Sequence, residues 1–462
     1  MRKTGLSAKC APEFYNFGFS CYNFSIMKIK LSFLAFFAVF FVLGCQTSYV
    51  EKIEDENSSV GQAEFEDFTQ KKYSPVSLKE FSDGFNHARY IYKNSVPPYN
   101  LYDEAQIAGI AENMVFLQNP DGGWAKNLDY QRIFTLEELK ALQEKNSRLK
   151  PVTYHLKTES HGSTMDNRNI FSQIRYLANV YMQIPENRYA ECAKRGILWI
   201  LNAQEPKTGG FTGADVFAIT FNDDVMADVL SFLNEVVQNR ELYAFVDEET
   251  CARAQNAYSR GIECILKTQI KVTLDDGSKI LTAWCQQHSY ENYAPVWARE
   301  FEPPSICSTE SKNVVKFLMK IENPSPEIQN AIISACEFFD RPEIRIHGKK
   351  LVRKTRKAEV LNGRYYDYEQ VLVDEPSAPD LWARFYALDS SFDVETGARK
   401  TISGTYPSVL KTVWCDRGCK YVEDFNSLSV ERRNGYGYTT SSMESLISTD
   451  FPAWKRKNGI SR

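Results

Sequence analysis

Apolar residues recur at helical spacing through most of the chain after residue 100. Between residues 102 and 117, Ile107, Ile110, Ala111, Met114 and Leu117 fall on one stripe at the three- and four-residue intervals of an α-helix. Similar patterns predict helices over residues 135–146, 171–182, 188–202, 225–237, 248–267 and 314–321, and one that starts at Ser325-Pro326. We therefore expect a mainly α-helical protein.

Local signals mark where several helices begin. Thr135 and Glu138 have the spacing of a capping box, and Ser325 before Pro326 is a typical N-cap. Ser305, Ser308 and Glu310-Ser311 are predicted to cap the helix that follows them. After Arg341 the pattern changes to short β segments at residues 344–347, 351–352 and 366–368, which predict a smaller β-rich part.

The N-terminal apolar run has a different character. Leu31 to Leu43 is unbroken, follows the basic residues Lys28 and Lys30, and is shorter than the roughly 20 residues that span a bilayer. This order is typical of an export signal, which we place at residues 27–45. The run ends in Val-Leu-Gly-Cys, which resembles a bacterial lipobox with Cys45 as the lipidated residue.

The amino-acid composition separates the rest of the chain into three segments. Residues 1–26 precede a good start at Met27 and are interpreted as a mis-called N-terminal extension. Residues 46–72 are acidic and poor in aliphatic side chains, which predicts a flexible tether. Residues 73–455 are rich in aromatics without a Pro- or Gly-rich break, so we expect one folded domain there.

Localisation and partners follow from these features. Gln46, directly after the lipidated cysteine, is not the Asp-type inner-membrane signal, so we expect an outer-membrane lipoprotein on the periplasmic or cell-surface face. The lipid anchor is its only expected membrane contact, and we expect a monomer. The net charge of −4 argues against a nucleic-acid partner. An acidic substrate would need a local cluster of Arg and Lys.

A weak repeat runs through the helical part. A helix that ends in Gln118, Gln204 or Gln269 leads each time to a glycine-bearing turn and then to an aromatic residue. The aromatics at 124, 211 and 284 are separated by 87 and 73 residues. Helix-pair repeats around a common axis would give this pattern. Three unrelated helix ends with glycine caps would explain it equally well.

Eight cysteines follow Cys45. Because disulfides form in exported proteins, Cys415 and Cys419 are predicted to form a local bridge. Cys192, Cys264 and Cys336 lie in helical apolar stretches and are predicted core residues. Paired CxxC motifs do not occur, so a structural zinc site is not supported.

Two acidic segments begin predicted helices. Asn222-Asp223-Asp224 precedes one, and Asp166-Asn167 precedes another. The simplest interpretation is helix capping, with Asn222 as N-cap and carboxylates in the first turn. The alternative is a calcium site, since neighbouring carboxylates and amide oxygens are suitable ligands. Two such segments in successive repeats would face each other, which favours the metal site.

Cations lie beside aromatics at separate points. Lys126 follows Trp124 in a Gly-rich turn, Arg299 and Arg384 each end a Trp-Ala-Arg tripeptide, and Arg433 lies in Glu-Arg-Arg-Asn. A tryptophan face can stack on a sugar, and guanidinium groups pair bidentately with uronate carboxylates. Taken singly, each also suits a turn or a surface ion pair.

Seven motifs together resemble one family. They are NPDGGWAKN, STMDN with IRYLANVY, ITFNDDVM, TAWCQQH, WAREFEPPSICSTESKNVVKFLM, WARFY and ERRNGYGY. Their order and spacing over about residues 100–440 resemble the family 10 polysaccharide lyases. The resemblance implies an (α/α)3 toroid with an additional smaller β-rich part. It also implies that residues 73–455 are a calcium-dependent pectate lyase (EC 4.2.2.2) that cleaves polygalacturonate, the de-esterified form of pectin, by β-elimination to 4,5-unsaturated oligogalacturonides.

The resemblance also implies roles for individual residues. Arg299 matches the arginine that the family uses as Brønsted base on the C5 proton. Asp166 and Asp223 match acidic residues near the calcium, with Asn167 and Asp224 as neighbours. The residues that would bind substrate carboxylates are Lys126, Arg384 and Arg364. The motifs above add Trp124 and Arg433 as further substrate-binding residues.

Two departures from the family pattern touch the substrate groove. Arg168-Asn169-Ile170 stands where the family tends to have Gly-Ala-Thr, and residues 210–218 form a shortened loop. A pectin-binding lipoprotein that has lost turnover is therefore one alternative. Another is a glycoside hydrolase on a helical toroid, in which Asp166 and Asp223 would be the two carboxylates.

Overall fold

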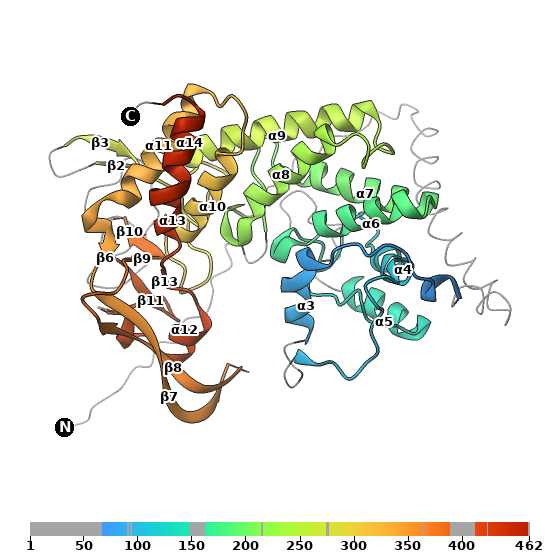
Figure 1. Cartoon of the computed structure of the whole chain (residues 1–462), viewed down its shortest axis with the longest axis horizontal. Helices are drawn as coiled ribbons and strands as arrows, with labels where there is room; N and C mark the ends of the chain where they lie inside the picture. The colour runs from blue at the N-terminus through green and yellow to red at the C-terminus, as the bar shows by residue number, and fades with distance from the viewer. Residues whose placement is uncertain are drawn as a thin grey trace, which may run out of the picture. The chain divides into compact units, whose positions relative to one another are not determined.

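The computed structural model describes residues 67–460, except residues 90–91, 93–94, 148–161, 214–215, 274–276, 363, 389–411 and 423 (Figure 1). The predicted extension, export signal and lipidated Cys45 lie outside the described residues. Residues 67–72, which we had assigned to the tether, are described, and residues 67–70 form a helical turn. Within the described ranges, no helix is long and apolar enough to cross a membrane.

Helices make up most of the regular structure, which confirms the mainly α-helical expectation. The α-helices are α3 (Ser82–Arg89), α4 (Ile107–Leu117), α5 (Leu136–Ser147), α6 (Phe171–Gln183), α7 (Asn187–Ala203), α8 (Val225–Gln238), α9 (Glu248–Thr268), α10 (Ser308–Leu318), α11 (Pro326–Asp340), α12 (Val430–Gly435), α13 (Met443–Ser445) and α14 (Phe451–Lys457). Short 3₁₀ turns include η1 (Lys79–Phe81), η3 (Asp166–Arg168), η4 (Asn222–Asp224), η5 (Pro342–Ile344) and η6 (Phe425–Ser427), and η7 (Leu446–Asp450) is a π-helical turn.

The long helices pack in consecutive pairs. Helix α6 packs along α7, α8 along α9, and α10 along α11, as Figure 1 shows for the first two pairs. Each helix buries an apolar stripe, such as Val229, Leu230, Phe232, Leu233 and Val236 of α8, all fully buried. Burial of such side chains contributes about 1.5–3 kcal/mol each, which offsets the entropy of ordering the chain.

Three glutamines link one helix pair to the next, and they confirm the repeat. Gln118, Gln204 and Gln269 follow α4, α7 and α9, and all three have the same extended backbone conformation. Each side-chain amide donates one hydrogen bond to the segment that follows it, at Gly122, Gly209 or Thr282, and a second to a following helix. The second bonds reach the carbonyls of Cys192 in α7, Ala257 in α9 and Ala331 in α11, at 2.8, 2.8 and 2.9 Å.

The aromatic of the repeat is a structural residue. The indole nitrogen of Trp124 donates to the carbonyl of Met114 at 2.8 Å, and that of Trp284 donates in the same way to Ile265 at 2.8 Å. In the turn before Phe211, Gly209 has a φ of 78°, and a Cβ there would lie 2.6 Å from a backbone oxygen. A glycine is therefore required in that turn.

Some predicted caps are present and others are wrong. Thr135 and Glu138 form the expected capping box, and the Ser325 hydroxyl accepts a bond from Ile328. Ser308 instead begins α10 with Cys307 as an N-cap that has no side-chain bond. Ser305 lies in a strand, because this stretch pairs with a strand 80 residues later in the chain.

The β-rich part consists of small antiparallel sheets. The described strands before Arg341 are β1 (Ile219–Thr220), β2 (Lys271–Thr273), β3 (Lys279–Leu281), β4 (Gln287–His288) and β5 (Ser305–Cys307). Those after it are β6 (Arg345–Ile346), β7 (Lys349–Leu361), β8 (Arg364–Asp374), β9 (Leu381–Ala383), β10 (Phe385–Ala387), β11 (Trp414–Asp416), β12 (Lys420–Val422) and β13 (Thr439–Thr440). Strands β13, β9 and β6 form one sheet, and the other sheets contain two strands each. The largest is the long ribbon of β7 and β8 (Figure 1).

The predicted bridge between Cys415 and Cys419 is wrong, since no disulfide joins these two residues. Cys415 lies in β11, and the register of the hairpin places Tyr421 of β12 opposite it. Cys419 lies in the turn, so the two cysteines are not cross-strand partners. Cys192, Cys264 and Cys336 are buried in the helices, as expected.

Candidate active site

The two acidic segments lie against each other. Turns η3 and η4 pack together, which confirms that the acidic starts of successive repeats face each other. Both turns bend sharply, because Asn167 and Asp223 have φ values of 54° and 51° inside them. Such positive φ values cost free energy in non-glycine residues, although Asn and Asp tolerate them best. The strained turns therefore place carboxylates at one end of the helices.

The two central carboxylates differ in their surroundings. Asp166 is buried and pairs with the ammonium group of Lys126. Asp223 keeps contact with solvent and accepts a bond from the Asn222 amide at 2.7 Å. Surrounding protein atoms and the Asp166 carboxylate raise the pKa of Asp223 to about 7, although Arg384 and Arg299 oppose this rise.

A buried network lies next to this carboxylate pair. Arg384 pairs with Glu310 and donates to the Asn222 side-chain oxygen at 3.1 Å. Gln286 donates to the same oxygen at 2.9 Å and to Glu310 at 3.2 Å. Burial alone would lower the pKa of Arg384, but the Glu310 carboxylate raises it above its ordinary value. Arg384 is therefore a permanent cation behind the acidic turns.

Arg299 is the more accessible arginine of the group. Its side chain is 41% exposed, compared with 14% for Arg384. Two of its guanidinium nitrogens donate to Glu302 at 2.8 and 2.5 Å. Burial alone would raise the pKa of Glu302, but Arg299 and the Tyr436 hydroxyl hold it below its ordinary value. The Arg299 side chain is thus anchored on one side and open to solvent on the other.

Tyr436 joins the two arginines. Its hydroxyl donates to Glu302 at 2.8 Å, and Gln286 donates to that hydroxyl at 3.1 Å. The guanidinium carbons of Arg384 and Arg299 lie 4.5 and 5.9 Å from the centre of its ring. Cation–π attraction of this kind contributes roughly 0.5–2 kcal/mol. One ring therefore contacts both cations.

Most of the predicted site residues lie together in the structure, but some of the functions predicted for them do not fit their contacts. Lys126, Asp166, Asp223, Arg299 and Arg384 belong to the cluster described above. Asn167 lies in the same turn as Asp166 and donates to Asn127, whereas Asp224 accepts a bond from Asn313 at 2.6 Å. The suggestion that Asn222 is only a helix cap is wrong, because its oxygen accepts the two bonds from Gln286 and Arg384.

Trp124 is not a sugar platform. Its side chain is fully buried and donates to the carbonyl of Met114, so no face is available to a substrate. Arg433 is also buried and is bonded to Glu369 and to the Gln370 carbonyl. Arg364 begins β8 at the tip of the ribbon and is exposed.

Sequence reasoning missed three members of the cluster. Gln286, Glu302 and Tyr436 were not singled out, and Glu310 was taken for a helix cap. All four lie inside the quoted motifs, so the motifs pointed to the right segments. Some of their partners are far away in the chain: Arg384 lies 74 residues from Glu310, and Tyr436 lies 150 residues from Gln286. No local pattern identifies such pairs.

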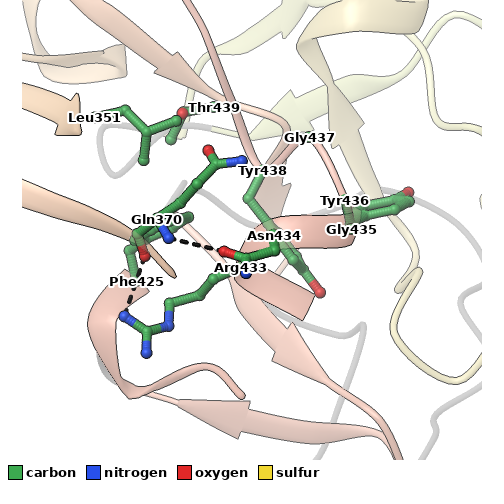
Figure 2. Close-up of a pocket in the computed structure, with 10 residues that line it drawn as sticks. All are labelled: Leu351, Gln370, Phe425, Arg433, Asn434, Gly435, Tyr436, Gly437, Tyr438 and Thr439. Carbon is green, nitrogen blue, oxygen red and sulfur yellow. Dashed lines mark hydrogen bonds between the residues drawn. The ribbon is translucent and has the colours of Figure 1, made fainter. Parts of the chain in front are cut away.

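A pocket lies beside Tyr436, between that residue and the β7–β8 ribbon (Figure 2). Its volume is about 370 Å³, and Leu351 and Gln370 line it from the ribbon. Arg433 and Asn434 hold the wall by bonds to the backbone of Gln370. The pocket therefore extends from the arginine cluster to the ribbon.

The altered residues 168–170 form part of η3 and its exit. Arg168 pairs with Asp228 at 3.4 Å and with Glu80 at 3.8 Å. Ile170 is fully buried with a φ of 73°, a costly conformation for a β-branched residue. These residues thus hold the acidic turn by contacts outside the carboxylate pair.

The donor set fits a cation only in part. In the portion of the chain that the structure describes, no three His, Cys, Asp or Glu side chains gather closely enough to hold a metal ion. Asp166, Asp223 and the Asn222 oxygen are nevertheless hard donors of the type that calcium prefers. Burial raises the pKa of Asp223, and the neighbouring Asp166 carboxylate adds to this rise.

Comparisons with known proteins agree with these observations. The sequence model of the pectic acid lyase family matches residues 118–447, well over half of the chain. Two solved structures of a family 10 polysaccharide lyase from Cellvibrio cellulosa are similar in fold, each at 22% identity and a TM-score of 0.54. One, a mutant in complex with trigalaturonic acid, covers 83% of this chain, the other covers 84%, and each is matched over 99% of its own length. A comparison with curated protein sequences gives no significant match.

Proposed function

The chain is a polysaccharide lyase that belongs to the pectic acid lyase family, and we propose that it cleaves polygalacturonate by β-elimination. The observation that carries this proposal is the pairing of Arg299, accessible and anchored by Glu302, with an acidic turn that can receive a cation. One of the similar structures contains trigalaturonic acid, which supports a uronate substrate.

The proposed chemistry removes one proton and one leaving group. A base takes the proton from C5 of a galacturonate, the C–H electrons form a C4–C5 double bond, and the bond from C4 to the glycosidic oxygen breaks. That oxygen takes a proton, which gives one new reducing end and one 4,5-unsaturated end. We propose Arg299 as the base, because it is the most exposed of the three arginines at Tyr436, the others being Arg384 and Arg432.

Arginine is a weak candidate for a base until its surroundings are considered. The guanidinium group has a pKa above about 12 in water. Arg299 pairs with Glu302, and the Arg384 charge lies over the same Tyr436 ring. The proposal therefore requires alkaline conditions. Arg384, held by Glu310, would orient a uronate carboxylate and need not exchange a proton.

Calcium would be held by the carboxylates of Asp166 and Asp223, because the Asn222 oxygen already accepts bonds from Gln286 and Arg384. Bound there, it would withdraw electrons from the uronate carboxylate and acidify the C5–H bond. Because calcium takes roughly six to eight ligands, substrate carboxylates and water would complete its shell. Lys126 already neutralises Asp166, so calcium would compete with this ammonium group.

The test is an assay on polygalacturonate at alkaline pH, first with calcium and then with a chelator. We expect ultraviolet absorbance from unsaturated uronate, and its loss with the chelator. New reducing ends without that absorbance would indicate a glycoside hydrolase. Binding without either product would indicate a pectin-binding protein that has lost turnover.

We also propose that the glutamine-linked helix pairs close into the (α/α)3 toroid. The series that joins α4, α7, α9 and α11 supports it, because each link turns to the next helix in the same way. A crystal structure with an open superhelix would contradict this. Lipidation of Cys45 and an outer-membrane location remain proposals from the sequence. A Cys45→Ala variant that still incorporates labelled palmitate would contradict them.

A further inference from the structure

The β7–β8 ribbon carries charge of the opposite sign to the whole chain. Strand β7 contains six Lys and Arg residues and one Glu, whereas the chain has a net charge of −4. Four of these cations are exposed, namely Lys350, Arg353, Lys354 and Lys357, and we call them the cationic edge. A local excess of this size attracts anions even when the protein as a whole repels them.

Most cations of the cationic edge form no ion pair with another described residue. Among the described residues, Lys350, Lys354 and Lys357 pair with no carboxylate. Glu369, which lies opposite Lys354 in the ribbon, is instead bonded to Arg433 at 2.9 Å. Arg353 lies over the ring of Tyr368 at 4.6 Å, which leaves its charge available to an anion.

The two sides of the ribbon differ. On the outer side of β8, the amides of Asn434 and Asn426 bond to the backbone of Gln370 and Leu372, so this edge is covered. Strand β7 pairs only with β8 among the described strands, and the cationic edge flanks its open side. Lysines on an open edge also prevent strand pairing. That role alone does not explain the exposed Tyr365, which is 65% accessible near the tip.

The ribbon is continuous with the candidate active site. Leu351 and Gln370 at its base line the pocket that Tyr436 borders on the other side (Figure 2). Arg364 lies at the tip, beside Tyr365. The ring of Tyr436 thus meets Arg299 and Arg384, and the pocket that Tyr436 lines reaches the 13-residue strand that carries the cationic edge. A polymer longer than the site could contact both.

We propose that the cationic edge is a second binding surface for polygalacturonate, which holds the polymer outside the site where it is cut. The inference rests on the proposed function, because it takes the substrate from there. A regular polyanion suits the edge, since each uronate offers a carboxylate to a cation and an apolar sugar face to Tyr365. Binding at two linked surfaces raises the affinity for long chains, whereas a trimer occupies only the active site.

The test uses the full chain with Arg299→Lys to prevent turnover, with and without Lys350→Ser, Lys354→Ser and Lys357→Ser. Dissociation constants are measured for long polygalacturonate and for trigalacturonate. We expect the triple variant to bind the polymer about tenfold more weakly and the trimer within about twofold of the parent. Added salt should reduce this difference because it screens the exposed charges.

Lys207→Ser, Lys271→Ser and Lys279→Ser form the matched control, since these lysines are also exposed and two of them lie on another hairpin. Unchanged polymer binding by the edge variant, or an equal loss in the control, overturns the inference. Equal weakening for the trimer overturns it as well, because the lysines would then act at the active site. An equal loss for dextran sulfate overturns the assignment to uronates. Loss of trimer binding in the parent itself contradicts the proposed function.

Discussion

The tripeptide Trp-Ala-Arg occurs twice, and the structure uses the two copies differently. Arg299 pairs with Glu302 three residues away and keeps 41% of its side chain exposed. Arg384 pairs with Glu310, 74 residues away, and keeps only 14% exposed. Both guanidinium groups nevertheless face the ring of Tyr436. The surroundings, and not the tripeptide, decide how accessible each arginine is.

The partners explain the difference. The Arg299 pair is formed within one loop, so it costs little to keep that side chain at the surface. The Arg384 pair joins the strand region to α10 and, through Asn222, to η4. A buried pair of this kind is expensive to break, because either partner alone is a buried charge. Arg384 should therefore determine stability, and Arg299 should determine turnover.

Replacement of Arg299 by Lys should have the largest effect on turnover. Lysine keeps a cation beside Glu302 but lacks the planar guanidinium group. Loss of a general base lowers kcat by about 10²–10⁴. The free energy of unfolding should change by less than about 1 kcal/mol, because Glu302 remains paired. Kinetics on polygalacturonate and urea unfolding check both values, and a fully active variant would remove Arg299 as the base.

Replacement of Arg384 by Ala should have a large effect on stability, unlike the Arg299 variant. It leaves the Glu310 carboxylate buried without its cation, which costs about 3–5 kcal/mol in stability. Replacing Arg384 and Glu310 together by Met should recover much of that loss, since no buried charge then remains. Urea unfolding measures both variants. If the single variant is as stable as the parent, the contrast between the two arginines is wrong.

Asp223→Asn should change how stability depends on pH. The Asp223 carboxyl has a pKa of about 4 in an unfolded chain and about 7 in the fold. Because the folded state binds this proton more tightly, the associated stability is fully present below about pH 4 and is lost as the pH rises through 7. The variant cannot lose this proton. Its free energy of unfolding should therefore fall less between pH 5 and 8 than that of the parent.

The response of stability to calcium gives a second test of the Asp223→Asn variant. At pH 8 we expect added calcium to raise the urea midpoint of the parent, since a cation relieves the repulsion between Asp166 and Asp223. The Asp223→Asn variant should respond less, because one donor carries no charge. Parallel pH profiles and equal responses to calcium would show that Asp223 does not carry the charge assigned to it.

Tyr436→Phe should have the smallest effect. It removes the hydroxyl that bonds to Glu302 and Gln286 but keeps the ring between the arginines. A lost hydrogen bond of this kind costs about 0.5–1.5 kcal/mol. Tyr436→Leu removes the ring as well and should affect both arginines. A double-mutant cycle with Arg384→Ala would show whether the ring couples them.

Local rules of the sequence predicted the helices well and the site only in part. The capping box at Thr135 and the helix bounds near residues 171, 225 and 248 agree with the structure to within a residue. These features depend on neighbours in the chain. Glu310 was misread as a cap because its real partner, Arg384, lies on a different segment. A local rule cannot distinguish an acid that caps a helix from one that holds a distant arginine.

The ribbon shows another limit. The sequence predicted short β segments at 351–352 and 366–368, whereas β7 and β8 span 13 and 11 residues. Period-two alternation reveals a strand only when one face is apolar. In β7 the cations fall on both faces, because much of the ribbon lies away from the core, so the alternation is hidden.

The glutamine links have a consequence for how the sequence can vary. Gln118, Gln204 and Gln269 bind main-chain carbonyls of the following helices. Every amino acid supplies such a carbonyl, so substitutions on the accepting helix leave the acceptor in place. Only the glutamine, which donates the bond, has to be a particular amino acid. The joints between repeats can therefore tolerate wide divergence of the helices that they connect, which fits a fold still shared at 22% identity.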